Sequence, residues 1–208
     1  MRYLLSLVLV VTHLGLFAQN VNKQNIPERK AANRVEMALP QVNGYTALRC
    51  DFHSHTVFSD GLVWPTYRIG EAWIQGLDVL AITDHDTTEG AVDFLQWLQV
   101  KKKNDLRVIM GEEVTCADGT HIIGLFLKKA IVSKTPLDVV KEIKEQGAFV
   151  YFPHPQRHDG ILNSVSFEEV LPWGDFYECF NAKISHEYNE AAVNSLSGYD
   201  HLKPLGGS

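Results

Sequence analysis

Residues 77–86 have the sequence LDVLAITDHD, an apolar run that ends in three titratable side chains. The first seven of these residues favour a buried strand, because most of them are aliphatic. Asp84, His85 and Asp86 then follow without a break, and such side chains are costly to bury unless a metal ion or hydrogen bonds compensate them. We therefore expect a central strand with reactive groups at its carboxyl end. Asp84 either orients an imidazole or begins the following helix.

Strands and helices alternate on both sides of this stretch. Strands are predicted over residues 48–53, 77–83, 107–115, 121–127, 148–152 and 176–180, and helices over 65–75, 89–102, 135–146, 167–171 and 187–196. Two of the strands are close enough to form a hairpin around Asp118-Gly119. This alternation predicts an α/β domain with a mostly parallel sheet or barrel, in which reactive groups gather at the carboxyl ends of the strands.

The sequence DFHSH, residues 51–55, places two histidines at the end of the first of these strands. Side chains two apart on a strand point to the same face, so His53 and His55 can ligate one metal ion. A tight turn then returns the carboxylate of Asp60 to the same strand end. At the end of the next strand, His85 is the candidate ligand.

Three further candidates lie at later strand ends. In the pair Glu112-Glu113, one carboxylate can bridge two metal ions and the other is expected to face solvent. His121 opens an apolar strand, and His154 stands between two prolines that stiffen the backbone. Chance explains five histidines and several carboxylates at successive strand ends poorly. A set of His, Asp and Glu ligands suits Zn, Mn or Fe and does not distinguish among them.

The order and spacing of these motifs resemble the PHP (polymerase and histidinol phosphatase) family. The likeness runs from residue 48 to residue 208 and includes a Glu-x-x-Asn sequence that begins at Glu178. It implies a distorted (β/α)7 barrel, a cluster of two or three divalent metal ions (Mn, Zn or Fe), and hydrolysis of phosphate esters by a metal-bound hydroxide. The metal ligands that it implies are His53, His55, Asp60, His85, Glu113, His121 and His154. Three of these, Asp60, His85 and His154, are also the catalytic candidates.

The sequence departs from the family pattern near residue 208. The family closes its site with Gly-Ser-Asp-x-His, whose Asp and His are ligands, whereas this sequence ends at Gly206-Gly207-Ser208. His201 is followed by Leu202-Lys203-Pro204 and is no substitute. We therefore expect the last barrel strand and two ligands to be missing, which would weaken metal binding and activity.

Hydrolysis of a small phosphate ester is the favoured function, and a diester is preferred over a monoester. Arg157 is the candidate contact for a phosphate oxygen, although an exposed arginine needs no special role. Two alternatives stay open: a metal-dependent amide or lactone hydrolase of another barrel family, and a non-catalytic metal-binding fragment. Trp64, Tyr67 and Trp73 are expected to form core or barrel wall and not a surface for stacking bases.

The N-terminal segment and the net charge carry the remaining expectations. An apolar run that follows Arg2 and ends at Ala18 indicates a signal peptide over residues 1–18, ahead of a leader arm over 19–46 and the phosphoesterase domain over 47–208. We therefore expect a periplasmic or secreted protein with no stable membrane association after cleavage. The net charge of -6 argues against extended binding of nucleic acid.

Overall fold

The computed structural model describes residues 34–35, 38–101 and 106–207. The predicted signal peptide and most of the predicted leader arm lie outside these residues. In the described part of the chain, no helix combines the length and the apolar character that crossing a bilayer requires.

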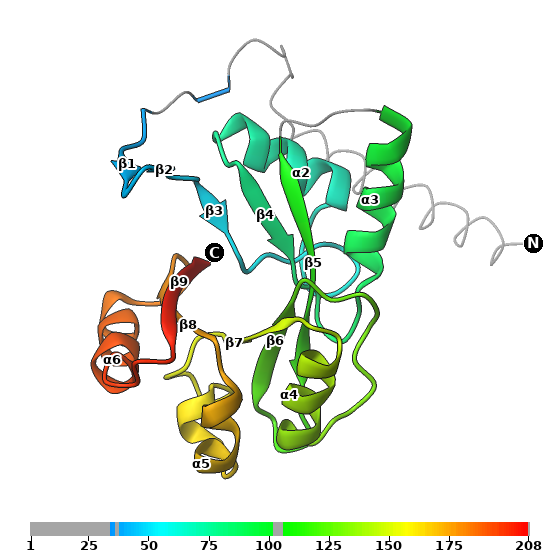
Figure 1. The fold of residues 1–208 in the computed structure, drawn as a ribbon. Coiled ribbons are helices and arrows are strands. Elements are labelled where there is room, and N and C mark those ends of the chain that lie inside the picture. The colour runs from blue at the N-terminus through cyan, green and yellow to red at the C-terminus, as the bar shows by residue number, and fades with distance from the viewer. Residues whose placement is uncertain (1–33, 36–37, 102–105, 208) are drawn as a thin grey trace, which may run out of the picture. The chain divides into compact units, whose positions relative to one another are not determined.

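A seven-stranded sheet forms the centre of the fold (Figure 1). In spatial order its strands are β3 (Cys50–Asp51), β4 (Val79–Ile82), β5 (Arg107–Thr115), β6 (His121–Leu125), β7 (Phe149–Phe152), β8 (Phe176–Asn181) and β9 (Lys203–Gly207). Neighbouring strands are parallel except at β6, which runs antiparallel to both β5 and β7. The mostly parallel sheet and the hairpin between β5 and β6 confirm the predictions from the sequence.

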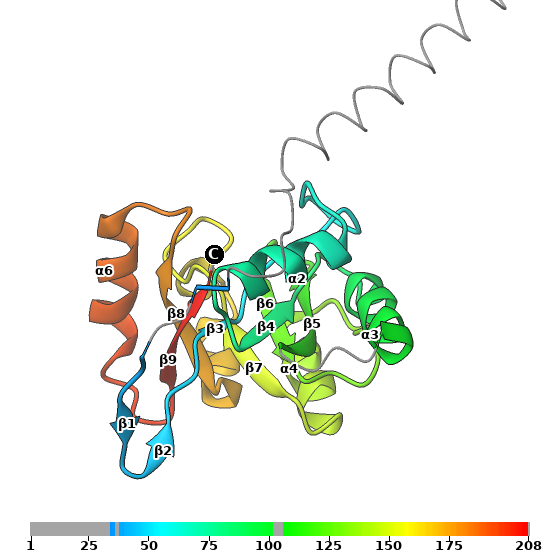
Figure 2. The ribbon, with the colours of Figure 1, turned by 90° about the horizontal axis from the view of Figure 1, so that it is seen from above.

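The strand β9 corrects an expectation. We predicted that the last barrel strand is missing, but Lys203–Gly207 pairs in parallel with β8. The backbone N–H of Phe52 also donates to the carbonyl of Gly206 at 3.3 Å, so the two edges of the sheet meet in a nearly closed barrel (Figure 2). Proline and glycine have low strand propensity, and β9 contains Pro204 and two glycines. Its strand conformation therefore depends on its neighbours and not on its own pattern.

The chain before the second strand of the barrel also differs from the prediction. Only Cys50–Asp51 of the predicted strand 48–53 is regular, so the histidines that follow lie outside the strand. Within the predicted leader arm, β1 (Gln41–Val42) and β2 (Tyr45–Thr46) form a hairpin. Asn43 and Gly44, which connect them, have φ angles of 52° and 81°. A two-residue type I′ turn requires positive φ at both positions, and Asn-Gly is its preferred sequence.

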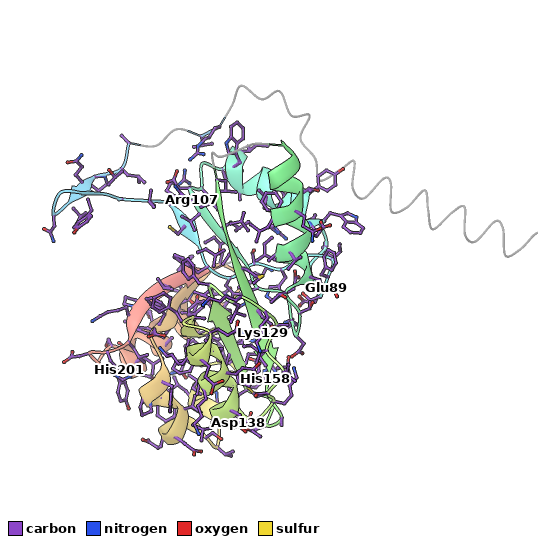
Figure 3. All side chains as sticks on the ribbon, turned by 45° about the vertical axis from the view of Figure 1, so that its right-hand side comes forward. Glu89, Arg107, Lys129, Asp138, His158 and His201 are labelled. Atoms are coloured by element: carbon purple, nitrogen blue, oxygen red, sulfur yellow. The ribbon has the colours of Figure 1, made fainter. Side chains whose placement is uncertain are left out.

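Helices surround the sheet on its outer side (Figure 1). They are α2 (Pro65–Ile74), α3 (Glu89–Lys101), α4 (Pro136–Glu145), α5 (Phe167–Val170) and α6 (His186–Leu196), with short 3-10 turns η1 (Ile161–Asn163) and η2 (Leu171–Trp173). The five helices predicted from the sequence are thus confirmed. Glu89 and Arg107, which are labelled in Figure 3, mark the beginnings of α3 and β5.

Alternation along the strands sorts their side chains into two layers. Along β4, Leu80 and Ile82 pack with residues of α2 and α3. Ala81, between them, belongs to an inner cluster together with Ile109 of β5. Every second side chain of a strand points to the same face, so Glu113, four residues after Ile109, also points into the barrel.

Candidate metal centre

The predicted ligands converge at the carboxyl ends of the parallel strands. They are His53, His55 and Asp60 after β3, His85 after β4, Glu113 in β5, His121 at the start of β6 and His154 after β7. Because β6 runs in the opposite direction, its first residue lies where the neighbouring strands end. The structure therefore brings all seven residues into one neighbourhood, while their role as metal ligands stays a prediction.

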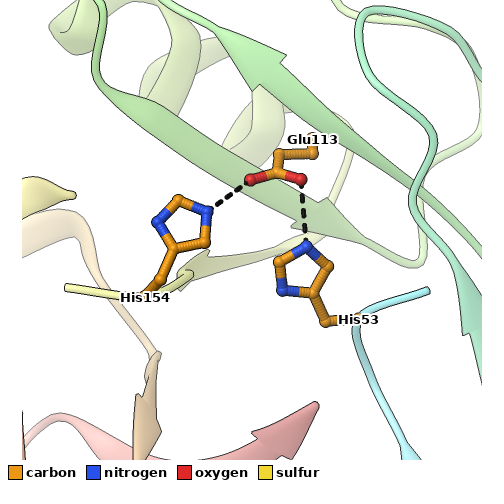
Figure 4. A group of neighbouring side chains, drawn as sticks. All are labelled: His53, Glu113 and His154. Carbon is orange, nitrogen blue, oxygen red and sulfur yellow. Dashed lines mark hydrogen bonds and ion pairs between the residues drawn. The ribbon is translucent and has the colours of Figure 1, made fainter. Parts of the chain in front are cut away.

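The buried carboxylate of Glu113 lies at the centre of this group, and Figure 4 shows His53 and His154 bound to its two different oxygens. Five imidazoles surround it. Its Oε2 is 3.0 Å from His53 Nε2, 3.1 Å from His55 Nε2 and 3.6 Å from His85 Nε2, and its Oε1 is 3.0 Å from His121 Nδ1 and 2.8 Å from His154 Nε2. A carboxylate that presents each oxygen to different imidazoles can bridge two cations, as in two-metal hydrolytic sites.

Asp60 and His85 form the open edge of the group. Asp60 Oδ1 lies 3.2 Å from His55 Nδ1, and Asp60 Oδ2 lies 3.9 Å from His85 Nε2. The side chain of Asp60 is 70% exposed, and that of His85 is partly exposed. The imidazoles of His53 and His154, in contrast, are buried. A small molecule can therefore reach the group from the side of Asp60.

The donor atoms fit cations better than they fit a closed network of hydrogen bonds. Sets of three donors lie within 4.8 Å of one another in four combinations, which are His53, Glu113 and His154; His55, Asp60 and His85; His85, Glu113 and His121; and His121, His154 and Asp159. The Nδ1 atom of His85 is buried without a hydrogen-bond partner, and the buried Nδ1 atoms of His121 and His154 contact carboxylate oxygens without an aligned hydrogen bond. Buried polar atoms normally have partners, and nitrogen and carboxylate oxygen are the donors that Zn, Mn or Fe bind.

The charges of the group favour a cation at its centre. Burial alone would lower the pKa of His53, but Glu113 and Glu178 outweigh burial and raise this pKa to about 10. Burial acts in the opposite direction on Glu113, yet His53, His121 and His154 hold the pKa of Glu113 well below its usual range. A proton on His53 thus provides positive charge that a bound metal ion can replace.

Glu178, in β8, orients His53 from outside the group. Its buried carboxylate accepts four hydrogen bonds. Oε1 accepts from His53 Nδ1 at 2.9 Å and from the Tyr151 hydroxyl at 3.1 Å, and Oε2 accepts from the backbone N–H of His154 at 2.7 Å and from the Asn181 amide at 3.0 Å. With Nδ1 held in this way, Nε2 of His53 faces the centre of the group. The Glu-x-x-Asn sequence therefore marks two residues that position ligands.

Asp84 has neither of the two roles that we expected for it. Its buried carboxylate accepts hydrogen bonds from the backbone N–H and the hydroxyl of Thr56, at 2.6 and 2.7 Å, and from the Ser59 hydroxyl at 2.7 Å. The end of β4 lies beside the loop that follows His55, so the side chain of Asp84 contacts this loop and not an imidazole. Asp84 thereby fixes the turn that presents Asp60.

Glu112 and Trp64 also correct the expectations from the sequence. Glu112 was expected to face solvent, but it is 0% exposed and accepts a hydrogen bond from the backbone N–H of Ile131 at 2.8 Å. Burial raises the pKa of this carboxyl to about 7. The outer side of β5 is covered by the segment that carries Ile131, so pointing out of the barrel does not mean pointing into water. Trp64, expected in the core or barrel wall, is 48% exposed and packs edge-on against Phe58, with 5.9 Å between the ring centroids.

The loop after His154 supplies a carboxylate that sequence analysis missed. Asp159 is buried, and its Oδ1 lies 3.2 Å from His154 Nδ1. Arg157, the predicted phosphate contact, donates to Asp159 Oδ2 at 3.1 Å, and its side chain is about half exposed. The only signal in the sequence is an acidic residue five positions after His154. Two backbone turns, in which Arg157 donates to His154 and Gly160 donates to Arg157, return Asp159 to the site.

This fold and this site define a class of protein, namely an α/β barrel in which His, Asp and Glu side chains at the strand ends could hold metal ions. A family model described as the PHP domain matches residues 51–202, and the chain belongs to the PHP domain family. The match runs from the second residue of β3 to the residue before β9 and so includes every barrel strand except β9.

Known relatives have the same fold or a similar sequence. Uncharacterized protein MJ1587 of Methanocaldococcus jannaschii is 33% identical over 161 residues, which cover 60% of this chain and 92% of that protein. A 5'-3' exoribonuclease of Haemophilus influenzae is 36% identical over 129 residues, which cover 60% of this chain and 46% of that enzyme. A solved two-domain protein of Bacteroides vulgatus, containing a predicted PHP-like metal-dependent phosphoesterase, superposes with a TM-score of 0.68 and 27% identity over 85% of this chain and 55% of its own. The chain thus spans about half the length of the last two proteins.

Proposed function

We propose that this chain hydrolyses a small phosphate ester, a diester in preference to a monoester, with two or three bound divalent cations. The observation that carries the proposal is the arrangement of five imidazoles about both oxygens of the buried Glu113, with Asp60 at the exposed edge. Membership of the PHP family supports the reaction class, and so does the Bacteroides vulgatus protein, which contains a predicted PHP-like metal-dependent phosphoesterase. The exoribonuclease relative supports a diester, because RNA is a phosphodiester.

Cations bound at this centre would polarise the phosphoryl oxygens and lower the pKa of a water molecule. The side chains of the protein divide the remaining tasks. Glu113 would help to hold the cations with both of its oxygens, because each oxygen faces different imidazoles. Asp60 and His85 line the open edge, so we assign to them the transfer of a proton at the substrate. The side chain of His154 is only 3% exposed, which restricts its catalytic role to holding a cation.

We further propose that Arg157 contacts a non-bridging phosphate oxygen. Its NH2 group donates to Asp159, which holds the guanidinium beside His154. A guanidinium has five N–H donors, so this ion pair leaves donors for a phosphate. The side chain is about half exposed and is therefore accessible to a substrate.

The location and the partners of the protein are part of this proposal. We propose that residues 1–18 act as a signal peptide and that the protein works in the periplasm or outside the cell, with no stable membrane association. The substrate is proposed to be a small molecule and not a long nucleic acid, because the net charge is -6. Donors of the types His, Asp and Glu are compatible with Mn, Zn or Fe.

The proposed reaction can be tested with chromogenic esters. The purified chain, freed of metal and reloaded with Mn²⁺ or Zn²⁺, is assayed on p-nitrophenyl phosphate and bis-p-nitrophenyl phosphate. We expect the diester to be cleaved faster, with the activity lost in His55→Ala. His186→Ala is the matched control, because His186 is 83% exposed and pairs with Glu190 within α6. Cleavage of an amide or lactone panel in place of both esters would contradict the proposal and favour the other hydrolase class.

A further inference from the structure

Three buried donor atoms beside Glu113 make ion-pair contacts but no aligned hydrogen bond. They are Nδ1 of His121, Nδ1 of His154 and Oδ1 of Asp159. These three side chains offer donor atoms that all lie within 4.8 Å of one another. The side chains of His154 and Asp159 are only 3% and 10% exposed, so bulk water does not satisfy them. Such atoms are rare in native proteins, and each needs a physical explanation.

The separations of these atoms match those of ligands around a common cation. Two donors that are each about 2.1 Å from a tetrahedral cation lie about 3.4 Å from each other. Nδ1 of His154 is 3.2 Å from Oδ1 of Asp159, and Nδ1 of His121 is 3.8 Å from Oδ2 of Asp159. The 3.2 Å contact is an ion pair without the alignment of a hydrogen bond at either of its atoms. Both separations are compatible with donors that share one cation.

We propose that Asp159 is a metal ligand, which completes a cation site with His121 and His154 next to Glu113. The proposal rests on the cation-binding part of the proposed function and adds a ligand to the seven implied by the sequence. Two imidazoles and one carboxylate suit Zn²⁺, Mn²⁺ or Fe²⁺. They leave coordination positions for Glu113 or for water.

Neighbouring contacts determine which atoms face the cation. Nε2 of His154 lies 2.8 Å from Glu113 Oε1, and in the tautomer with the proton on Nε2 the lone pair of Nδ1 is free for the cation. Arg157 donates to Oδ2 of Asp159 at 3.1 Å and leaves Oδ1 for the cation. The backbone N–H of His121 donates to the carbonyl of Asp159 at 2.8 Å. This bond ties the loop to β6 and keeps the two ligands at a constant separation.

A competing arrangement would place the cation on Nε2 of His154 and use Asp159 only to orient Nδ1–H. Anomalous diffraction from crystals of the chain soaked with Zn²⁺ distinguishes the two. We expect an ion at about 2.0–2.2 Å from Asp159 Oδ1 and from Nδ1 of both His121 and His154. An ion on Nε2 of His154, with Asp159 beyond bonding distance, would overturn this proposal and leave the proposed function standing.

Titration of Zn²⁺ against a chromophoric chelator provides the matching test in solution. Asp159→Asn should lose one equivalent of tightly bound Zn²⁺, with the affinity of that position reduced more than about 100-fold, because an outer partner alone changes affinity by about 10–100-fold. Asp93→Asn removes the same charge from an exposed position on α3 and should bind Zn²⁺ like the wild type.

The outcomes of this titration separate the two proposals. Far-UV circular dichroism first confirms that both variants are folded. An unchanged number of bound ions in Asp159→Asn, with or without a loss of about 10–100-fold in affinity, would make Asp159 at most a positioning residue and overturn its role as a ligand. Absence of Zn²⁺ binding by the wild type would overturn the proposed function as well.

Discussion

The substitution Glu178→Gln tests how the protein prepares His53 for a metal ion. The carboxylate accepts hydrogen bonds at both oxygens, from His53 and Tyr151 at Oε1 and from His154 and Asn181 at Oε2. A glutamine keeps the shape but replaces one acceptor oxygen with an NH2 group, which cannot accept a hydrogen bond. Two of the four donors must therefore lose their acceptor or change their own hydrogen bonding.

The substitution affects the hydrogen bond from His53 most strongly. If the NH2 group takes the place of Oε1, the imidazole must present a lone pair at Nδ1 and carry its proton on Nε2. Nε2 is the atom that lies 3.0 Å from Glu113, so this tautomer blocks the nitrogen that is to bind the cation. If the NH2 group takes the place of Oε2, the backbone N–H of His154 loses its acceptor instead. Either orientation disturbs a predicted ligand.

The expected magnitude follows from these contacts. Loss of an outer partner of a metal-bound histidine typically weakens metal affinity by about 10–100-fold, which corresponds to about 1.4–2.7 kcal/mol. In the metal-free protein, loss of a charge-assisted hydrogen bond to His53 should lower the free energy of unfolding by about 1.5–3 kcal/mol. Both quantities can be measured, the first by Zn²⁺ titration against a chelator and the second by urea denaturation.

Glu190→Gln is the matched control for this prediction. Glu190 is 61% exposed and pairs with His186 within α6, so removal of its charge should leave both quantities unchanged within error. Tyr151→Phe removes one donor to Oε1 but keeps the carboxylate, and it should weaken Zn²⁺ binding less than Glu178→Gln does. A folded Glu178→Gln protein that binds Zn²⁺ with wild-type affinity would refute the orienting role.

Three further predictions concern pH, packing and metal removal. The pKa of Glu112 is raised by burial, so its ionisation opposes folding: stability is fully present below its ordinary pKa of about 4.3 and is lost as pH rises to about 7. Glu112→Gln should therefore gain roughly 2–3 kcal/mol relative to wild type between pH 5 and pH 8 in urea denaturation, and an equal pH dependence of both proteins would contradict this. A Cβ added at Gly207 would lie 2.3 Å from Glu178 Oε1 and 2.5 Å from His53 Cβ, so Gly207→Ala should destabilise the protein by about 1–3 kcal/mol. A Cβ added at Gly206 would have its nearest neighbour at 3.9 Å, so Gly206→Ala should lower the stability less. Equal melting temperatures of the two variants would show that the surroundings of Gly207 relax freely. Removal of Zn²⁺ by a chelator should lower the melting temperature and preserve the far-UV spectrum. A free Zn²⁺ concentration of 100 times the Kd stabilises the folded state by about 2.7 kcal/mol. An unchanged melting temperature would argue against a metal site in the folded state.

The regular elements could be predicted wherever local pattern and neighbours agree. The predicted limits of the third strand, 107–115, are those of β5, because this strand is long and ends in polar residues. The helices were predictable because proline stands in the first turns of α2 and α4 and because apolar residues recur along each helix. The strand β9 was not predictable, because proline and glycine, which make up three of its residues, have low strand propensity.

The site divides in a similar way. His53, His55 and His85 could be placed at strand ends from their positions after apolar runs. The positions of Glu178 and Asp159 beside the site could not be predicted. They depend on the direction of each side chain and on its distance from a partner far away in the sequence. Glu178 lies 125 residues after His53, and no local pattern relates them.

By itself, the sequence determined the donor types, their order along the chain and the strands that deliver them. Only the tertiary structure decided which donors share an oxygen of Glu113, that Glu112 is buried behind another segment, and that Asp159 returns to His154. The physical reason is that local periodicity records which residues alternate faces along a strand. What each face meets is set by the pairing of distant strands and the return of distant loops, and these depend on the whole chain.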